Sequence, residues 1–295
     1  MAHVTLDELN RMDRQAFIAE LGDIFEHSPW IAEAAYAPRP FPDLHALYQA
    51  LTDTVRNADA TRQIALIAAH PDLAGKAARE GIITTDSKME QASAGLDRLT
   101  DQEFEKFHKL NDAYRAKFNI PFIVCVRRHG KESILRQFEL RLANDEAAER
   151  ATALNEIFRI AALRLDQRVT APDRLKVHGR LSTHVLDTYR GNPAADVKVE
   201  LFEITSFRPP RRIVCATTNA DGRTDGPLIA DQPIPIAEYE LRFEIGAYFA
   251  SNGTPAADPP FLGIVPIRFG VAEPEADYHV PLLVTPWSYS TYRGS

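Results

Sequence analysis

Long hydrophobic runs and cysteine are scarce in this chain of 295 residues. No stretch reaches the roughly 18 consecutive apolar residues of a membrane-spanning helix, so we expect no membrane segment. The first residues lack the features of a secretory signal, and the last four differ from a Ser-Lys-Leu peroxisomal address. We therefore expect a cytoplasmic protein. Its two cysteines, Cys125 and Cys215, each lie in an apolar run, which predicts buried free thiols in a reducing compartment.

Runs of basic residues are also missing. The formal net charge is −7, and no cluster of Lys and Arg offsets it, so a nucleic-acid partner is disfavoured. The hydrophobic content of 45% and the charged content of 25% are ordinary for a globular protein. A chain of this length can form two domains that each bury a core.

The sequence pattern changes at residues 166–180. This stretch contains Pro172 and Gly179 and has no apolar periodicity, so it is expected to be a linker. Before it, apolar residues recur at helical spacing; after it, they alternate in short runs. The change predicts two unlike domains, residues 1–165 and residues 181–295.

Helical signals run through the first domain. Residues 44–55 carry one of several apolar stripes at helical spacing. Thr and Glu lie three residues apart at Thr5–Glu8 and at Thr100–Glu103, which is the spacing of an N-terminal capping box. Almost nothing in this half alternates as a strand does, so the first domain is predicted to be all-α.

His70 precedes Pro71, and this proline predicts that a helix ends at the histidine. A histidine held by backbone geometry at that point suits a general acid or base near neutral pH. For a single histidine, a structural role in which it binds the last carbonyls of its helix is the more common one.

Ser87 and Glu90 lie three residues apart and fit another capping box. The same helix start could also bind an anionic ligand, because it presents free N–H groups and the positive end of the helix dipole. The two interpretations are compatible.

The first domain contains an ordered set of four motifs between Phe17 and Leu165. They are Glu26-His-Ser-Pro-Trp30, Ala69-His-Pro-Asp-Leu73, Ser87-Lys-Met-Glu-Gln-Ala-Ser-Ala-Gly95, and Asn111-Asp-Ala-Tyr114 through Pro121-Phe122. This set resembles the OHCU decarboxylase family, which acts on 2-oxo-4-hydroxy-4-carboxy-5-ureidoimidazoline (OHCU). The family is all-helical, uses no cofactor and yields (S)-allantoin.

The resemblance implies a site. His70 would be the catalytic acid. The substrate-binding residues would be Pro71, Ser87, Glu90 and Gln91, with main-chain groups of Phe122, Ile123 and Val124 in the segment that ends at Val126. The family also has an arginine in its final helix, for which Arg164 is the candidate and Arg141 the alternative. Loss of CO2 leaves charge that the heterocycle can delocalise, so a positioned histidine and a few hydrogen-bonding groups suffice.

Strand signals fill the second domain. Val197, Val199 and Leu201 alternate with polar residues, residues 219–222 form a turn, and residues 246–252 suggest one short helix. Pro281 and Pro286 predict strands at an edge or a bulge. Short strands separated by turns predict an antiparallel sandwich.

Four segments of this domain resemble the transthyretin-related 5-hydroxyisourate hydrolases: residues 181–187, 219–223, 278–286 and the tail 289–295, which ends Tyr-Arg-Gly-Ser. Taken singly, the polar residues in them are more often exposed strand residues, and a short polar tail is more often frayed. The whole set distinguishes the hydrolases from transthyretin, a carrier of the same fold.

That resemblance implies a second site and an assembly. The catalytic residues would be His184, Arg223, His279 and Tyr292, with Ser290, Thr291 and Arg293 beside the substrate. Two histidines could suggest zinc, but no third ligand is evident, so no metal is expected. The family is a homotetramer, and the helical domains could also pair among themselves.

The two resemblances describe consecutive reactions, since the hydrolase product is the decarboxylase substrate. The sequence therefore predicts a bifunctional enzyme with small-molecule substrates, 5-hydroxyisourate and OHCU. One alternative is a transthyretin-type binding protein with a helical scaffold. A second alternative is that one domain is an active enzyme and the other domain is degenerate.

Overall fold

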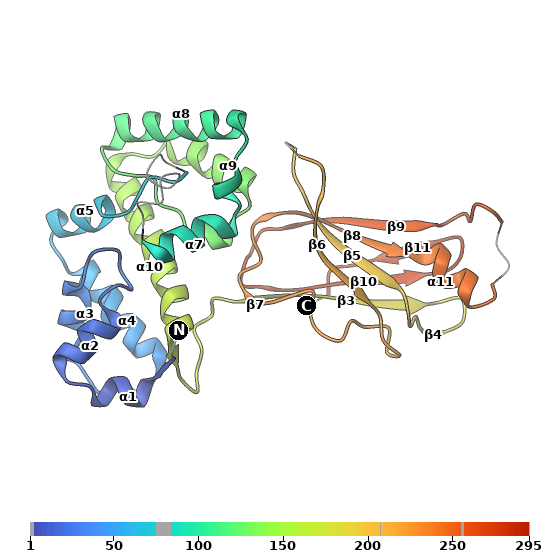
Figure 1. The fold of residues 1–295 in the computed structure, drawn as a ribbon, viewed down its shortest axis with the longest axis horizontal. Coiled ribbons are helices and arrows are strands. Elements are labelled where there is room, and N and C mark those ends of the chain that lie inside the picture. Colours follow the sequence, from blue (N-terminus) through green and yellow to red (C-terminus); the bar gives the residue numbers. More distant parts are fainter. Residues whose placement is uncertain (1–2, 75–83, 207, 255–256, 295) are drawn as a thin grey trace. The chain divides into compact units, whose positions relative to one another are not determined.

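The computed structural model describes residues 3–74, 84–206, 208–254 and 257–294. The chain forms two compact units (Figure 1): Met1–Arg127 with Ser133–Val177, and Arg128–Glu132 with His178–Ser295. Of the stretch expected to link two domains, residues up to Val177 belong to the first unit. Leu175 and Val177 are buried in its core.

Helices build the first part of the chain. In order they are α1 (Leu6–Arg11), α2 (Arg14–Leu21), α3 (Trp30–Ala35), α4 (Leu44–Arg56), α5 (Ala60–Ala68), α7 (Thr85–Ser93), α8 (Asp101–Phe118), α9 (Lys131–Arg141) and α10 (Glu146–Arg168). Short 3-10 turns follow α7 and precede α9, at Leu96–Arg98 and Val126–Arg128. A two-stranded parallel ladder pairs β1 (Val4–Thr5) with β2 (Val169–Thr170). The predicted all-α architecture is confirmed.

Capping residues explain where several helices begin. The boxes at Thr5–Glu8 and Thr100–Glu103 are both formed. The capping box expected at Ser87–Glu90 is wrong, because α7 begins at Thr85 and Thr84 is its N-cap. The Thr84 hydroxyl accepts a hydrogen bond from the Ser87 N–H. Ser87 therefore lies inside the first turn, where its own hydroxyl is available for other partners.

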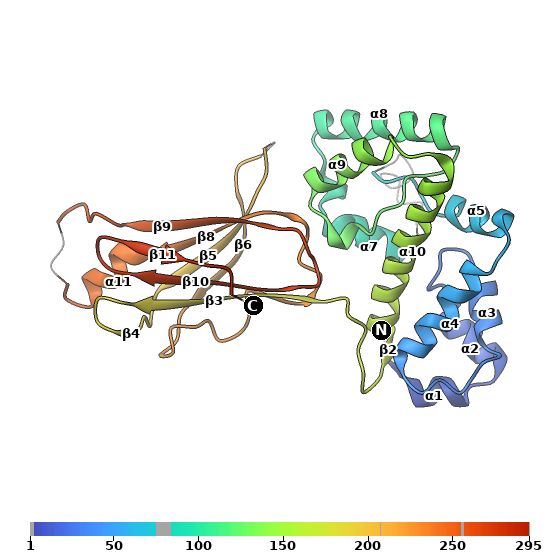
Figure 2. The same ribbon diagram turned by 180° about the vertical axis from the view of Figure 1, so that it is seen from behind.

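Helix α10 runs through the middle of the helical unit in both ribbon views (Figures 1 and 2). Its buried residues include the charged side chains Glu149, Glu156 and Arg164. Buried charges require partners, and all three have them, so this helix carries polar networks as well as apolar packing.

The second unit is built from strands. They are β3 (Gly179–Asp187), β4 (Asn192–Pro193), β5 (Lys198–Ile204), β6 (Arg211–Thr217), β7 (Ile229–Gln232), β8 (Ala237–Glu244), β9 (Ile264–Val271), β10 (Asp277–Val284) and β11 (Tyr289–Thr291), with the short helix α11 (Ile245–Ser251) after β8. One sheet has the order β6-β5-β8-β9; the other has the order β11-β10-β3-β4, with β7 also on β3. Inward residues of both sheets share one apolar core. The sandwich is confirmed, with one parallel pairing, β10 with β3.

Pro281 departs from the expectation for prolines in strands. Its strand β10 is not at an edge, because it lies between β3 and β11. The neighbouring odd-numbered residue His279 exchanges both backbone hydrogen bonds with Gly294 on the tail side, so the missing N–H of Pro281 faces the tail as well. The register on both sides places Tyr292 opposite Pro281, one residue beyond the end of β11 at Thr291, so the missing N–H lies where this ladder is interrupted. Pro286 lies in the turn before β11, outside the strands.

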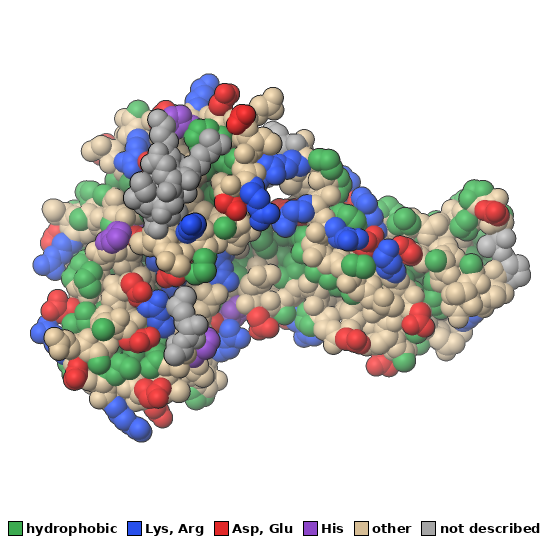
Figure 3. Space-filling model, viewed as in Figure 1, with side chains coloured by type: hydrophobic (Ala, Val, Ile, Leu, Met, Phe, Trp, Pro, Cys, Tyr) green, Lys and Arg blue, Asp and Glu red, His purple; other side chains and the backbone are tan. Residues whose placement is uncertain are grey.

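Cys215 also departs from expectation. Cys125 is buried, but Cys215 is exposed, because its strand β6 is an edge strand whose polar face includes the exposed Thr217. No described helix is long and apolar enough to cross a membrane. On the face drawn in Figure 3, acidic and basic side chains appear on both units.

Candidate active sites

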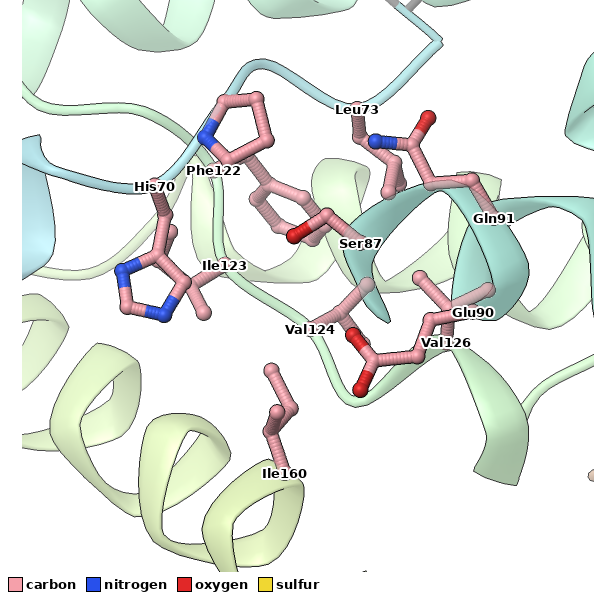
Figure 4. A pocket seen from close by; sticks show the side chains of 11 residues that line it. His70, Leu73, Ser87, Glu90, Gln91, Phe122, Ile123, Val124, Val126 and Ile160 are labelled. Carbon is pink, nitrogen blue, oxygen red and sulfur yellow. The ribbon is translucent and has the colours of Figure 1, made fainter. Parts of the chain in front are cut away.

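A pocket in the helical unit is lined by residues from four separate stretches of the chain (Figure 4). Its lining residues are His70, Pro71, Leu73, Ser87, Glu90, Gln91, Phe122, Ile123, Val124, Val126 and Ile160. The structure thus brings together every pocket residue expected from the first resemblance except the arginine. The resemblance did not assign Leu73 or Ile160 to the pocket. Both contribute apolar surface to its lining.

Helix α5 ends at Ala68 and Ala69 is its C-cap, so the helix stops two residues before His70 rather than at it. The Nδ1 of His70 lies 3.0 Å from the Leu66 carbonyl oxygen. A carbonyl can only accept, so Nδ1 carries the proton and a neutral ring has its lone pair on Nε2. Burial lowers the pKa of His70 to about 4, outweighing the Leu66 carbonyl and Glu26, which both favour the charged form. The common structural role is therefore present, and it sets the tautomer.

A buried ionic network connects α7 to Glu26 and Arg164. The Glu26 carboxylate accepts hydrogen bonds from the Thr84 hydroxyl at 2.6 Å, from the Ser87 hydroxyl at 3.2 Å and from Arg164 Nη1 at 3.0 Å. Arg164 also forks onto Glu90, with distances of 2.8 and 3.0 Å. In the sequence, the signal for Glu26 is its place at the start of the motif Glu26-His-Ser-Pro-Trp30, which does not by itself assign it a contact.

The two carboxylates of this network differ in their titration. Burial raises the pKa of Glu90 even though Arg164 opposes it. Burial also acts to raise the pKa of Glu26, but the Thr84 hydroxyl and Arg164 outweigh it, so the pKa of Glu26 lies below its usual value. Glu26 and Glu90, which both bind Arg164, therefore have pKa values shifted in opposite directions, as is common in acid–base sites.

Both candidate arginines are buried, but they have different partners. Arg164 binds Glu26 and Glu90. Arg141 binds the Glu149 carboxylate and donates to the Ile123 carbonyl at 2.6 Å. Neither lines the pocket directly; Arg164 contacts a pocket side chain, and Arg141 contacts the backbone of the pocket wall.

The loop after His70 is held by two amide side chains. Gln91 Oε1 accepts from the Ala74 N–H at 3.0 Å, and Asn111 Nδ2 donates to the Leu73 carbonyl at 2.7 Å. The Gln91 oxygen is therefore engaged, which leaves its amide N–H groups for the pocket.

In the β unit, His184 on β3 and His279 on β10 lie on neighbouring strands, with ring centroids 6.5 Å apart. Arg223 forms a β-bridge with His184. The Ser182 hydroxyl lies 3.0 Å from His279 Nδ1. The structure thus brings together three residues from distant parts of the second domain.

Both histidines are biased toward the neutral form. Burial, followed by the Arg223 charge, lowers the pKa of His184 and of His279. His184 Nε2 is buried and has no hydrogen-bond partner among the described residues. No group of three or more His, Cys, Asp or Glu side chains suited to a metal ion occurs in the described part of the chain.

The polar tail is tied to β10. Ser290 and Thr291 pair with Leu283 and Leu282 in the ladder of β11, and Gly294 forms a bridge with His279. The Arg293 guanidinium lies 4.6 Å from the ring centroid of Tyr278. Tyr292 is 57% exposed. The frayed tail that a short polar segment suggests is not seen through residue 294.

Comparison with known proteins agrees with both parts of this description. The profile of the OHCU decarboxylase family matches residues 10–166, and the profile of the HIUase/transthyretin family matches residues 181–294. A 2-oxo-4-hydroxy-4-carboxy-5-ureidoimidazoline decarboxylase of Halalkalicoccus jeotgali is 41% identical over 58% of this chain and 95% of its own. A 5-hydroxyisourate hydrolase of Ralstonia nicotianae is 51% identical over 40% of this chain and 99% of its own.

One solved structure matches along almost the whole chain. It is a crystal structure of (S)-allantoin synthase, which is 34% identical with a TM-score of 0.53 and covers 99% of this chain and 100% of its own. The chain therefore belongs to the OHCU decarboxylase family in its helical part and to the HIUase/transthyretin family in its β part.

Proposed function

We propose that this chain is a bifunctional enzyme of urate degradation. Its β unit hydrolyses 5-hydroxyisourate to OHCU, and its helical unit decarboxylates OHCU to (S)-allantoin. The observation that carries the proposal is that one chain holds both sets of clustered site residues and matches an (S)-allantoin synthase over its full length.

In the decarboxylation, the bond between C4 and the carboxylate carbon breaks and its electron pair passes into the conjugated ring. C4, which carries the hydroxyl, becomes a carbonyl carbon of allantoin, so the hydroxyl proton must leave. A proton must also reach one face of the neighbouring carbon, and the ring nitrogen that takes up the electron pair gains a further proton from solvent. A histidine with a pKa of about 4 is neutral at pH 7. His70 would therefore first accept the hydroxyl proton at Nε2 and then return it to carbon as the acid.

The other pocket groups would orient OHCU. The Ser87 hydroxyl, the Glu90 carboxyl and the Gln91 amide project from α7 toward the pocket, opposite the segment of Phe122–Val126 (Figure 4). We assign them, with Pro71 and the main-chain groups of Ile123 and Val124, to binding the ureido and ring amides. Arg164 would act through Glu90, by setting its position and charge. Holding one face of the ring toward His70 would make one enantiomer.

In the hydrolysis, a neutral histidine would take a proton from water as the water attacks a carbonyl of the six-membered ring. The ring opens when the C–N bond at that carbonyl breaks, and the same proton would pass to the departing nitrogen. His184 and His279 are both biased toward that neutral form. Arg223 would stabilise the negative charge on the substrate oxygen. Tyr292 would position the ring, with Ser290, Thr291 and Arg293 beside it. No metal or organic cofactor is assigned to either step.

We further propose a homotetramer built by the β unit. Strand β11 is at the end of its sheet, and an unpaired edge can pair with another copy. Nearby, Tyr189 and Trp287 are 52% and 58% exposed and pack edge to face at 5.7 Å. Light scattering coupled to size-exclusion chromatography tests this: a monomer across micromolar concentrations contradicts it. Pairing of the helical units would appear as further association that is lost when residues 178–295 are expressed alone.

The activity is tested with freshly generated 5-hydroxyisourate. Its loss is followed by ultraviolet absorbance and the handedness of the product by circular dichroism. Rapid loss with direct formation of one allantoin enantiomer is expected. Rapid loss followed by a lag and racemic allantoin would contradict the decarboxylase assignment, and ligand binding without turnover would contradict both.

A further inference from the structure

One wall of the decarboxylase pocket has no regular secondary structure. Residues 121–125 belong to no helix and no strand, yet Phe122, Ile123 and Val124 are nearly fully buried and line the pocket. Peptide groups buried outside helices and sheets need partners from elsewhere. The partners of this segment therefore decide how it is held.

Two helical side chains bind this wall from behind. Arg141, the last residue of α9, donates from Nη1 to the Ile123 carbonyl at 2.6 Å. Glu156 of α10 accepts from the Cys125 N–H at 2.8 Å. Neither Arg141 nor Glu156 lines the pocket. The two bonds bracket Val124, which does.

These bonds fix the direction of the Val124 peptide groups. In a trans peptide the C=O and the N–H point to opposite sides, and the cis bonds of the described chain lie elsewhere, at Arg39-Pro40 and Asp258-Pro259. When the Ile123 carbonyl points to Arg141, the Val124 N–H points away from it. When the Cys125 N–H points to Glu156, the Val124 C=O points away likewise. Within the described residues, neither Val124 group has a hydrogen-bond partner.

Arg141 is itself held in place. Its Nε lies 2.9 Å from the Glu149 carboxylate, which is fully buried and also binds the Tyr114 hydroxyl. The Arg141 guanidinium stands 4.4 Å from the centroid of the Phe122 ring. Removing one member would leave a buried charge unpaired, so the cluster resists displacement of the wall.

We propose that Arg141 and Glu156 are positioning residues of the decarboxylase. They hold the Val124 N–H and C=O toward the pocket, as a donor and an acceptor for the adjacent C=O and N–H of the cyclic urea in the substrate. Arg141 thus serves the site through the backbone, whereas Arg164 serves it through Glu90. This inference rests on the proposed decarboxylase function.

The test compares two substitutions of nearly equal size at Glu156. Glu156→Met removes the acceptor for the Cys125 N–H, and we expect KM for OHCU, generated in situ by excess hydrolase, to rise about tenfold, the equivalent of one hydrogen bond. Glu156→Gln keeps an acceptor oxygen and should restore KM to within about twofold of the parent. Glu139→Met, an exposed position on α9, is the control for substitution by methionine.

The readout separates positioning from folding. A variant that only folds less well has fewer active molecules, so its maximal rate falls while KM is unchanged. The hydrolase rate of the same chain reports the amount of intact protein. If Glu156→Met does not fold, Arg141→Lys is used as the test variant instead. Lysine keeps the positive charge, but its single ammonium group cannot bind Glu149 and the Ile123 carbonyl together as the arginine guanidinium does. Titration calorimetry with (S)-allantoin then measures the same loss of affinity.

Any of three results overturns the inference. They are a KM for Glu156→Met equal to that of the parent, equal rises in KM for Glu156→Met and Glu156→Gln, and an unchanged affinity of Arg141→Lys for (S)-allantoin. A parent chain that does not decarboxylate OHCU would instead refute the proposed function.

Discussion

At the scale of single residues, His70 shows how a structural contact can prepare a functional group. The Leu66 carbonyl engages Nδ1, which fixes the tautomer and leaves Nε2 for the pocket. Burial disfavours the imidazolium. The resemblance implies a catalytic acid. Because burial keeps the ring neutral, the proposed mechanism has the ring take the hydroxyl proton of the substrate before it acts as that acid.

This assignment predicts the pH dependence of decarboxylation. The active form of His70 is neutral, and protonation removes it only as the pH falls through about 4. We expect kcat/KM for OHCU to stay level from pH 7.5 to about pH 5 and to decline below that, with a limiting slope of about tenfold per pH unit. Rapid-mixing assays with pre-formed OHCU measure it. A midpoint near 6.5, the usual value for histidine, would contradict the assignment.

At the scale of elements, the start of α7 links helix capping to the pocket. Thr84 caps the helix and also donates to Glu26, which binds Ser87 and Arg164. Thr100 caps α8 in the same way, but among the described residues its side chain bonds only within its own helix start. Comparing substitutions at the two caps therefore distinguishes an effect on helix stability from an effect on the ionic network.

Substitution of these caps gives a matched pair. Thr84→Ala and Thr100→Ala should each lower the free energy of unfolding by about 1 kcal/mol. Only Thr84→Ala should also change the decarboxylase, with kcat/KM reduced about tenfold because Glu26 loses a charge-assisted hydrogen bond. Thermal denaturation and steady-state kinetics measure the two effects. Equal kinetic losses in both variants would show that Thr84 acts only as a cap.

The tail segment is a second element whose position matters. Gly294 bridges to His279, and a Cβ on Gly294 would lie 3.0 Å from His279 Cδ2 and 3.1 Å from His279 Cβ. Contacts this short require the ring or the tail to move.

Gly294→Ala should therefore reduce the hydrolase kcat/KM about tenfold or more and leave decarboxylation of added OHCU unchanged. Gly270→Ala on β9 is the control, since a Cβ there would meet no atom within 4 Å. Ultraviolet assays of 5-hydroxyisourate loss compare the two. Parental hydrolase activity in Gly294→Ala would show that His279 does not depend on the tail.

At the scale of the whole molecule, the two reactions should be separable by single substitutions. His70→Ala should leave the rate of 5-hydroxyisourate loss unchanged and give a lag with racemic allantoin. His184→Ala should slow that loss by about 100-fold or more, the usual contribution of a general base, while added OHCU is still converted to one enantiomer. Absorbance and circular dichroism on the same samples measure both. Loss of both activities in either variant would mean that the units are catalytically interdependent.

Much of this protein follows from the sequence alone. Local rules act within a few residues, so the caps at Thr5 and Thr100 and the alternation in the strands were predictable, and the end of α5 was predicted to within two residues. Motif order was enough to name both families, because several uncommon segments recur together.

Other features were decided only by the tertiary structure. Helix α7 begins at Thr85 with Thr84 as its N-cap, and Pro281 lies in an inner strand where the ladder with the tail is interrupted. The separate partners of Arg141 and Arg164, and the contacts that Glu26 and Glu156 make, join segments that are distant in sequence. Buried charges are placed by partners that only folding brings within hydrogen-bond distance, so no local pattern could have assigned them.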